Sequence, residues 1–208
     1  MKHIRSLLIA PLFSLALMLP VQAAELIPLN EISAWFNSFK TAQTRFTQIN
    51  DDGSRTAGQL LIKRPGKLRF EYDAPETGPG GALVMAGGGQ VAIFDPASTE
   101  PPQRFPLSQT PLKIILARNV DLGATDMVVG HTLNGDLTTV TAQDPDRPDY
   151  GAIQLMFSED PLQLRQWIIF DGAGGQTTVL FEPLEMGEPL SNSLFYVKGE
   201  MTRRGFTE

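Results

Sequence analysis

About eleven short stretches of this 208-residue chain have the spacing and composition of β-strands. The clearest is 67–73, where Leu68, Phe70 and Tyr72 alternate with charged residues, so that one face is apolar and the other is charged. Clusters of Gly, Pro, Asn and Asp separate the stretches, as is typical of an antiparallel sandwich or barrel. The predicted strands are 44–49, 59–64, 67–73, 82–86, 90–95, 127–133, 137–143, 153–158, 164–171, 176–181 and 194–198.

The first of two predicted helices spans 29–39. Its apolar residues recur at helical spacing, which places them on one face, and Asn30 is the expected N-cap. The pattern fits an ordinary helix packed on a sheet at least as well as it fits a lid that faces a ligand. The apolar residues are Leu29, Ile32, Trp35, Phe36 and Phe39.

The second predicted helix spans 110–119. Thr110 is the expected N-cap, Pro111 suits the first helical position, and Asn119 suits the C-terminal end. Two short helices against a many-stranded sheet predict a mainly β, or α+β, protein in which helices cover one opening.

The first 23 residues have the parts of a secretory signal peptide. Lys2 and Arg5 precede a 13-residue apolar run, and cleavage is expected after Ala23. The apolar run is shorter than the roughly 20 residues that a membrane-spanning helix needs. We therefore expect a cleaved signal peptide at 1–23 and a single exported domain at 24–208, with a retained N-terminal anchor as the alternative.

Composition excludes several classes of function. The chain has 17 Lys+Arg against 23 Asp+Glu, and removal of Lys2 and Arg5 leaves 15 against 23, a net charge of −8. Such an acidic balance argues against binding to nucleic acid. The chain has no cysteine, so neither a disulfide nor a lipid on cysteine is available to it.

Groups that could perform catalysis or bind a metal are scarce. With His3 in the predicted signal peptide, His131 is the one histidine left. Together with the absence of cysteine, this argues against cysteine nucleophiles, zinc clusters and histidine metal sites. The carboxylates Asp144 and Asp146 flank a proline, and turn composition explains them without a glycosidase. We therefore expect no enzyme activity, no catalytic residue and no metal site.

Ordered motifs extend over the first part of the chain. They are GQLLIKRPGKLRFEY at 58–72 followed by Pro75, Phe46-x-Gln48 before it, Phe94-Asp95-Pro96 after it, and Thr110-Pro111 with Ala117-Arg118-Asn119. In this order and spacing they resemble the LolA family of periplasmic outer-membrane lipoprotein carriers. The resemblance is weaker beyond Asn119.

The resemblance implies an incomplete antiparallel β-barrel of about eleven strands, with short helices forming a lid over an apolar cavity. It implies a soluble, monomeric periplasmic carrier. The carrier receives lipoproteins from an inner-membrane lipoprotein-releasing ABC transporter, shields their acyl chains and delivers them to the outer membrane. A separate outer-membrane receptor is left open, and no cofactor is implied.

Arg64 is the candidate lid latch. Period-two counting places it on the same face as Leu60 and Ile62, so its guanidinium would point to the apolar side. A buried arginine needs acceptors, which carbonyl groups of a lid could supply. The matching arginine of the family is thought to latch the lid, so the resemblance gives Arg64 that role. A surface arginine at a strand end is the alternative.

Eight apolar residues are the candidate lining of the acyl-chain cavity, although a plain core would have the same pattern. They are Trp35, Phe36 and Phe39 of the first helix, Leu68 and Phe70 of the strand after Pro65, and Leu112, Ile115 and Leu116 of the second helix.

Two features depart from the family pattern, and two other functions remain possible. The predicted last strand, 194–198, lacks the family's Phe-x-Phe ending, and the loop 76–81 is longer and richer in glycine.

The first alternative function is a periplasmic sensor or regulatory domain that binds lipoprotein acyl chains, a class that generally has a second domain. The other is an envelope hydrolase, which the missing nucleophile motif disfavours.

Overall fold

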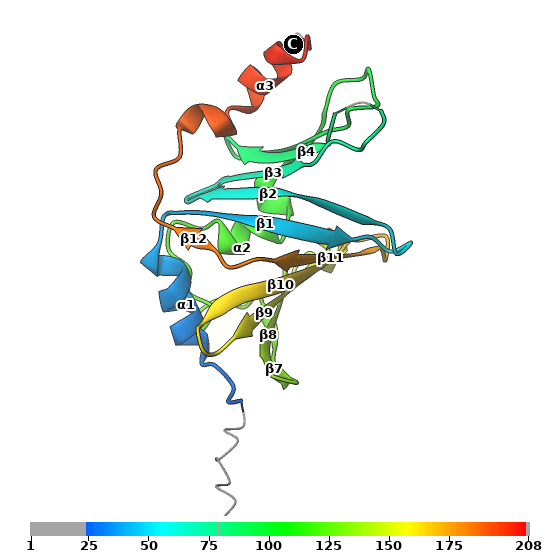
Figure 1. Cartoon of the computed structure of the whole chain (residues 1–208). Coiled ribbons are helices and arrows are strands. Elements are labelled where there is room, and N and C mark those ends of the chain that lie inside the picture. Colours follow the sequence, from blue (N-terminus) through cyan, green and yellow to red (C-terminus); the bar gives the residue numbers. More distant parts are fainter. Residues whose placement is uncertain (1–23, 79, 207–208) are drawn as a thin grey trace, which may run out of the picture.

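The computed structural model describes residues 24–78 and 80–206, and the predicted signal peptide lies outside them. One antiparallel sheet carries helices on both faces (Figure 1). The helices are α1 (Leu29–Ser38), α2 (Leu112–Ile115) and α3 (Val197–Arg203), with short 3-10 helices η1 (Leu107–Gln109), η2 (Pro148–Tyr150) and η3 (Asn192–Phe195). The strands are β1 (Thr41–Ile49), β2 (Arg55–Lys63), β3 (Lys67–Tyr72), β4 (Leu83–Gly87), β5 (Gln90–Phe94), β6 (Gln103–Pro106), β7 (Val128–Asn134), β8 (Leu137–Gln143), β9 (Ala152–Ser158), β10 (Gln163–Phe170), β11 (Gln176–Phe181) and β12 (Glu185–Met186).

The strands follow the order β6-β5-β4-β3-β2-β1-β11-β10-β9-β8-β7, and β12 also pairs with β1. Every ladder is antiparallel, and within the described residues none joins β6 to β7. The predicted incomplete antiparallel barrel is therefore confirmed, with eleven strands in the main path and β12 beside it.

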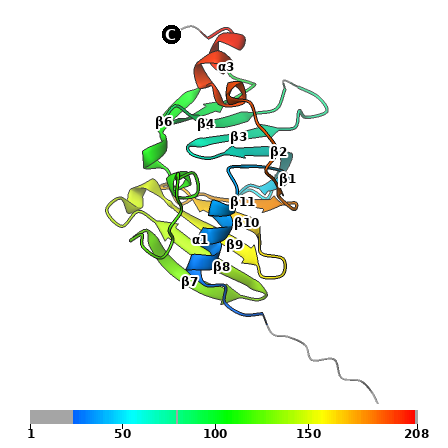
Figure 2. The ribbon, with the colours of Figure 1, turned by 90° about the vertical axis from the view of Figure 1, so that its left-hand side faces the viewer.

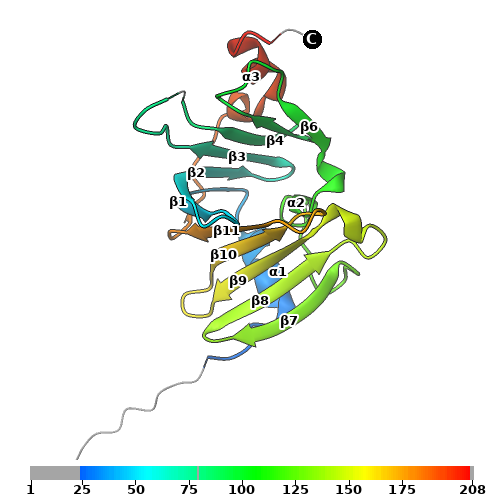
Figure 3. The ribbon, with the colours of Figure 1, turned by 90° about the vertical axis from the view of Figure 1, so that its right-hand side faces the viewer.

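The inner face of the sheet carries the main hydrophobic cluster. Leu60 pairs with Phe70, and Ile62 pairs with Leu68, so that four buried apolar side chains of β2 and β3 share this face. Helix α1 lies across the same face, in front of β8–β11 in Figure 2 and behind these strands in the opposite view of Figure 3. The alternation predicted for 67–73 therefore places Leu68 and Phe70 as expected.

The first helix begins at Leu29, as the predicted range 29–39 has it, but its N-cap differs from the predicted one. Its N-cap is Pro28, which has an extended backbone, and no side chain caps it. The prediction of Asn30 as the N-cap is therefore wrong. The reason is that the amides of Glu31 and Ile32 already find an acceptor in the carbonyl of Pro28, so the helix does not need a side-chain cap at Asn30.

The second helix is shorter than predicted. It spans only Leu112–Ile115, and the hydroxyl of Thr110 donates to the carbonyl of Leu107 instead of capping α2. The helix does not continue through the residues after Ile115, because their backbone groups bond to other elements. The carbonyl of Ala117 accepts from Arg64, and the backbone of Val120 pairs with Asn37.

The prediction of a strand at 194–198 is wrong, since this region forms η3 and α3. Ser191 caps η3 by accepting from the amide of Ser193. Val197 and Met201 lie one helical turn apart and pack on the outer face of β4 and β5. The outer face therefore has its own small core, which consists of Leu83, Met85, Ala92, Phe94, Val197 and Met201, with Phe206 beside it.

Two short strands were not predicted. All four residues of β6 are exposed and both residues of β12 are exposed, so neither has the alternation that indicates a half-buried strand. Along the described residues, no helix is both long enough and apolar enough to cross a membrane.

Candidate functional site

Arg64 follows β2 and enters the inner face, where its side chain is 7 % exposed. Its guanidinium donates to the carbonyls of Phe36 and Phe39 at the C-terminal end of α1, with an Nη1–O distance of 3.3 Å to Phe39. Nη2 also donates to Oδ1 of Asn37 at 3.0 Å. The end of α1, where unpaired carbonyls favour a cation, is therefore held by one arginine.

The same guanidinium bonds to residues 116–122, which follow α2 and which we call the post-α2 segment. Nε and Nη2 donate to the carbonyl of Ala117 at 3.1 and 2.9 Å, and Nη2 reaches that of Arg118 at 3.4 Å. The amide of Gly66, in the β2–β3 turn, donates to the carbonyl of Leu116 at 2.8 Å. Arg64 therefore bridges the barrel to α1 and to the post-α2 segment.

The acceptors that the structure shows for Arg64 are all neutral. Burial lowers the pKa of Arg64, but an arginine side chain in a protein stays charged. The cation is thus stabilised by oriented carbonyl groups, each of which carries only a partial charge. Such bonds hold the helices in a defined place without an opposing full charge.

All eight candidate cavity residues lie in the main hydrophobic cluster of the inner face. They come from three separate parts of the chain, as the sequence predicted: α1 and its C-cap, β3, and α2 with its C-cap. Their side chains are buried against the same cluster, and Arg64 lies beside them. The members are Trp35, Phe36, Phe39, Leu68, Phe70, Leu112, Ile115 and Leu116.

Aromatic contacts anchor α1 to the sheet. The Trp35 ring lies edge-to-face with Phe36, Phe39 and Phe157 at centroid distances of 5.0, 5.2 and 5.8 Å, a favourable arrangement for aromatic pairs. Nε1 of Trp35 is buried and has no hydrogen-bond partner within the described part of the chain. Of the three partner rings, only that of Phe157, on β9, belongs to the sheet, so Trp35 adds an apolar contact between α1 and the barrel to the polar contact made by Arg64.

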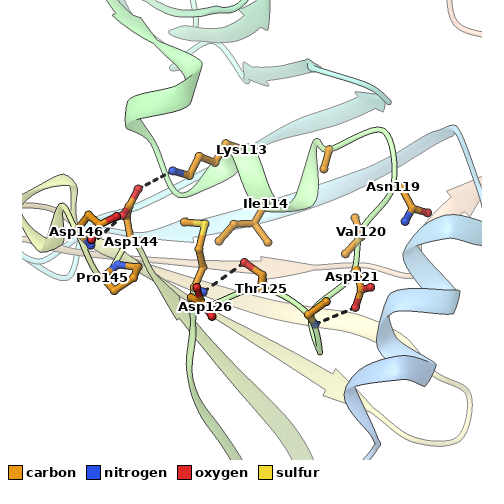
Figure 4. Close-up of a pocket in the computed structure, with 13 residues that line it drawn as sticks. Lys113, Ile114, Asn119, Val120, Asp121, Thr125, Asp126, Asp144, Pro145 and Asp146 are labelled. Carbon is orange, nitrogen blue, oxygen red and sulfur yellow. Dashed lines mark hydrogen bonds and ion pairs between the residues drawn. The ribbon is translucent and has the colours of Figure 1, made fainter.

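A pocket of about 660 Å³ opens beside α2 (Figure 4). The post-α2 segment, residues 124–127 before β7 and the β8–β9 connection form its other walls. Lys113 Nζ lies 2.6 Å from Asp144 Oδ2 and closes one side; this hydrogen bond lowers the pKa of Asp144. Ile114, Val120 and Met127 contribute apolar groups. The pocket thus lies at the edge of the inner-face cluster, and its opening is lined by both polar and apolar groups.

Sequence reasoning missed two polar residues of α1 that belong to this site. Asn37 bonds to both Arg64 and Val120, and Ser33 bonds to the amide of Leu122. A signal was present, because Ser33 and Asn37 are four residues apart and therefore lie on one side of the helix, next to its aromatic face.

No group of three or more His, Cys, Asp or Glu residues that could hold a metal occurs among the described residues. His131, on β7, is half-buried, and its Nε2 lies 2.9 Å from the carbonyl oxygen of Ile27. This histidine therefore contacts the segment before α1 and lies apart from the Arg64 site.

The fold and the site together define a half-open β-barrel with helices held over its apolar inner face. The sequence model of one family, described as outer membrane lipoprotein carrier protein LolA, matches residues 37–198. The chain therefore belongs to the LolA family, and the resemblance noted in the sequence is confirmed.

The chain is also similar to several known proteins. The chain is 29 % identical over 210 residues to an outer-membrane lipoprotein carrier protein of Pseudomonas paraeruginosa, with 94 % of each chain covered. It is 28 % identical over 207 residues to the protein of the same description from Pseudomonas aeruginosa strain UCBPP-PA14, again with 94 % of each covered. A crystal structure of a LolA superfamily protein from Nitrosomonas europaea matches with a TM-score of 0.43 and 11 % identity, covering 81 % of this chain and 97 % of that one.

Proposed function

We propose that this protein is a soluble periplasmic carrier for lipoproteins. It receives them from an inner-membrane lipoprotein-releasing ABC transporter, shields their acyl chains within the inner-face cluster and delivers them to the outer membrane. Membership of the LolA family and relatives described as outer-membrane lipoprotein carrier proteins support this proposal. The same proposal assigns residues 24–208 to the mature carrier and gives it no catalytic step.

The observation that carries the proposal is the way Arg64 holds α1 and the post-α2 segment over an apolar face. A carrier must offer its apolar surface to the acyl chains when loaded and cover that surface when empty. The bonds from Arg64 to neutral carbonyl groups of α1 and the post-α2 segment suit a cover that opens, since each can be replaced by a bond to water.

The energetics of the cargo explain the need for a cover. Each buried methylene of an acyl chain contributes about 0.8 kcal/mol, so a lipoprotein with two or three chains cannot cross an aqueous compartment unshielded. In our proposal the acyl chains take the place of α1 and α2 against Leu68 and Phe70. Both residues are buried on β3, in the same hydrophobic cluster as residues of these helices.

The first test is release of a lipoprotein from a membrane. Purified protein spanning 24–208 is incubated with energised spheroplasts or inner-membrane vesicles that contain the transporter. We expect radiolabelled lipoprotein to appear in the soluble fraction bound to the protein. Failure with a range of native lipoproteins would contradict the proposed function.

The second test concerns Arg64 as the latch. Its bonds stabilise the closed, empty protein, so their loss removes part of the driving force that expels the cargo. We therefore expect Arg64→Leu to reduce delivery to outer-membrane vesicles more than it reduces capture, with Arg55→Leu on the exposed start of β2 as the matched control. Equal delivery by wild type and Arg64→Leu would remove Arg64 from the mechanism.

A further inference from the structure

The side chain of Asn37 pairs with the backbone of Val120 in both directions. Its Nδ2 donates to the carbonyl of Val120 at 2.7 Å, and its Oδ1 accepts from the amide of the same residue at 2.9 Å. The two residues are 83 positions apart in the sequence. An amide side chain has both a donor and an acceptor in the geometry that such a two-point pairing requires.

A second bond lies one turn earlier on α1. The hydroxyl of Ser33 accepts from the amide of Leu122 at 2.9 Å and donates to the carbonyl of Leu29 at 2.6 Å. Ser33 is buried, so the loss of this partner would leave the Leu122 amide without one away from water. Asn37 and Ser33 therefore bond α1 to the post-α2 segment along one side of the helix.

We propose that Asn37 and Ser33 join α1 and the post-α2 segment into a single body, which Arg64 attaches to the barrel and releases as one unit. This inference rests on the proposed function, in which these elements form the cover of the acyl-chain site. Asn37 is then a positioning residue, because its Oδ1 accepts from Arg64 and from Val120 at once. An arriving acyl chain meets one opening movement instead of two independent ones.

Amide hydrogen exchange of the ligand-free protein tests the inference. The reporters are the amide of Phe36 within α1 and the amide of Leu116, which donates to Leu112 at the end of α2. Neither amide bonds to a side chain of Asn37 or Ser33. Exchange at each reports the free energy of the local opening that exposes it.

In the wild-type background, we expect Arg64→Leu to accelerate exchange at both reporters by the same factor, within about twofold. Addition of Asn37→Leu and Ser33→Ala to Arg64→Leu should make the two factors differ by about tenfold, because the loss of the joining bonds lets each element open alone. Ser38→Ala is the matched control, since its hydroxyl bonds to Trp35 within α1 and does not reach the post-α2 segment.

Asn37→Asp with Ser33→Ala is a milder pair for the same test. The aspartate keeps an oxygen for Arg64 and places a second oxygen opposite the carbonyl of Val120, where no donor remains. If the acceleration of exchange differs between the Phe36 and Leu116 amides in this pair of substitutions, the inference is supported. Unequal factors for Arg64→Leu alone, or equal factors after the joining bonds are removed, overturn it. The measurement uses no cargo, so a failure of lipoprotein release in the separate transfer assay would contradict the proposed function without changing this result.

Discussion

Arg64 and Arg69 are both buried, at 7 % and 6 % exposed, but they lie on opposite faces of the same sheet. Arg64 faces inward and bonds only to neutral groups of α1 and the post-α2 segment. Arg69, on β3, faces outward under α3 and pairs with Glu200 at 3.4 Å and Glu71 at 3.1 Å. The chain therefore attaches helices to its sheet by two different kinds of arginine contact.

The two contacts differ in the cost of separating them. Glu200 is 3 % exposed and also bonds to Arg203 and Arg204, each at 2.8 Å. Separation of a buried carboxylate from its arginines leaves a charge without a partner, which is strongly unfavourable. Separation of Arg64 from carbonyl groups leaves only dipoles to be hydrated. The outer contact suits a helix that stays in place, whereas the inner contact suits helices that move.

The largest effect should come from Glu200→Gln. The substitution keeps the size of the side chain but leaves the buried Arg69 with Glu71, which is 56 % exposed, as its one remaining carboxylate partner among the contacts that the structure shows. We expect a loss of about 3–5 kcal/mol in the free energy of unfolding, as measured for buried ion pairs that lose one partner. Urea denaturation followed by circular dichroism provides the measurement.

The control for this substitution is Glu188→Gln, at an exposed position of the segment before η3. It removes the same charge without a buried partner and should leave the unfolding free energy nearly unchanged. A loss for Glu200→Gln no larger than that of the control would show that the outer contact does not hold α3 more firmly.

Arg64→Leu should destabilise the protein less than Glu200→Gln does. The leucine fills part of the apolar space, and the freed carbonyls of Phe36 and Ala117 lose a donor, a cost of about 1–3 kcal/mol. The same urea titration, run in parallel, measures it. A loss greater than that of Glu200→Gln would reverse the comparison and count against an inner contact that opens easily.

The inner contact was predictable from sequence, and the outer contact was not. Strand alternation is local, so counting from Leu60 and Ile62 was enough to point Arg64 inward. The burial of Glu200 depends on Arg69, 131 residues earlier in the chain, and no local pattern contains that information. Large apolar residues around Phe195 fit a strand as well as a helix, and only packing on β4 and β5 decides between them.

The prediction of a helix over the post-α2 segment was wrong for a similar reason. Its sequence favours a longer helix, but Arg64 and Asn37 take its backbone groups, and both lie more than 50 positions away. Tertiary hydrogen bonds therefore overrode local helix signals. The candidate cavity residues could be named because their apolar spacing is local, whereas the polar bonds that position them could not.

The smallest expected effect is a difference between the Glu200 and Arg64 variants in how the free energy of unfolding depends on pH. Burial raises the pKa of Glu200, but the hydrogen bond from Arg204 and the charges of the three arginines lower it by more, so the net pKa is below the usual value of 4.5. A carboxylate with a depressed folded-state pKa stabilises the protein above its unfolded-state pKa. That stability is lost as the pH falls through the folded-state value.

This dependence is tested by measuring the free energy of unfolding at a series of pH values, from pH 7 down to the lowest pH at which the protein is still folded. Between wild type and Glu200→Gln, the gap should be constant above about pH 5 and should narrow as the pH falls below 4.5, because protonation makes Glu200 neutral like the glutamine. The gap between wild type and Arg64→Leu should stay constant over the same range, since no carboxylate faces Arg64 among the contacts that the structure shows. A gap for Arg64→Leu that narrows in acid would indicate a carboxylate partner on the inner face, and the contrast between a movable neutral contact and a fixed ionic one would then no longer hold.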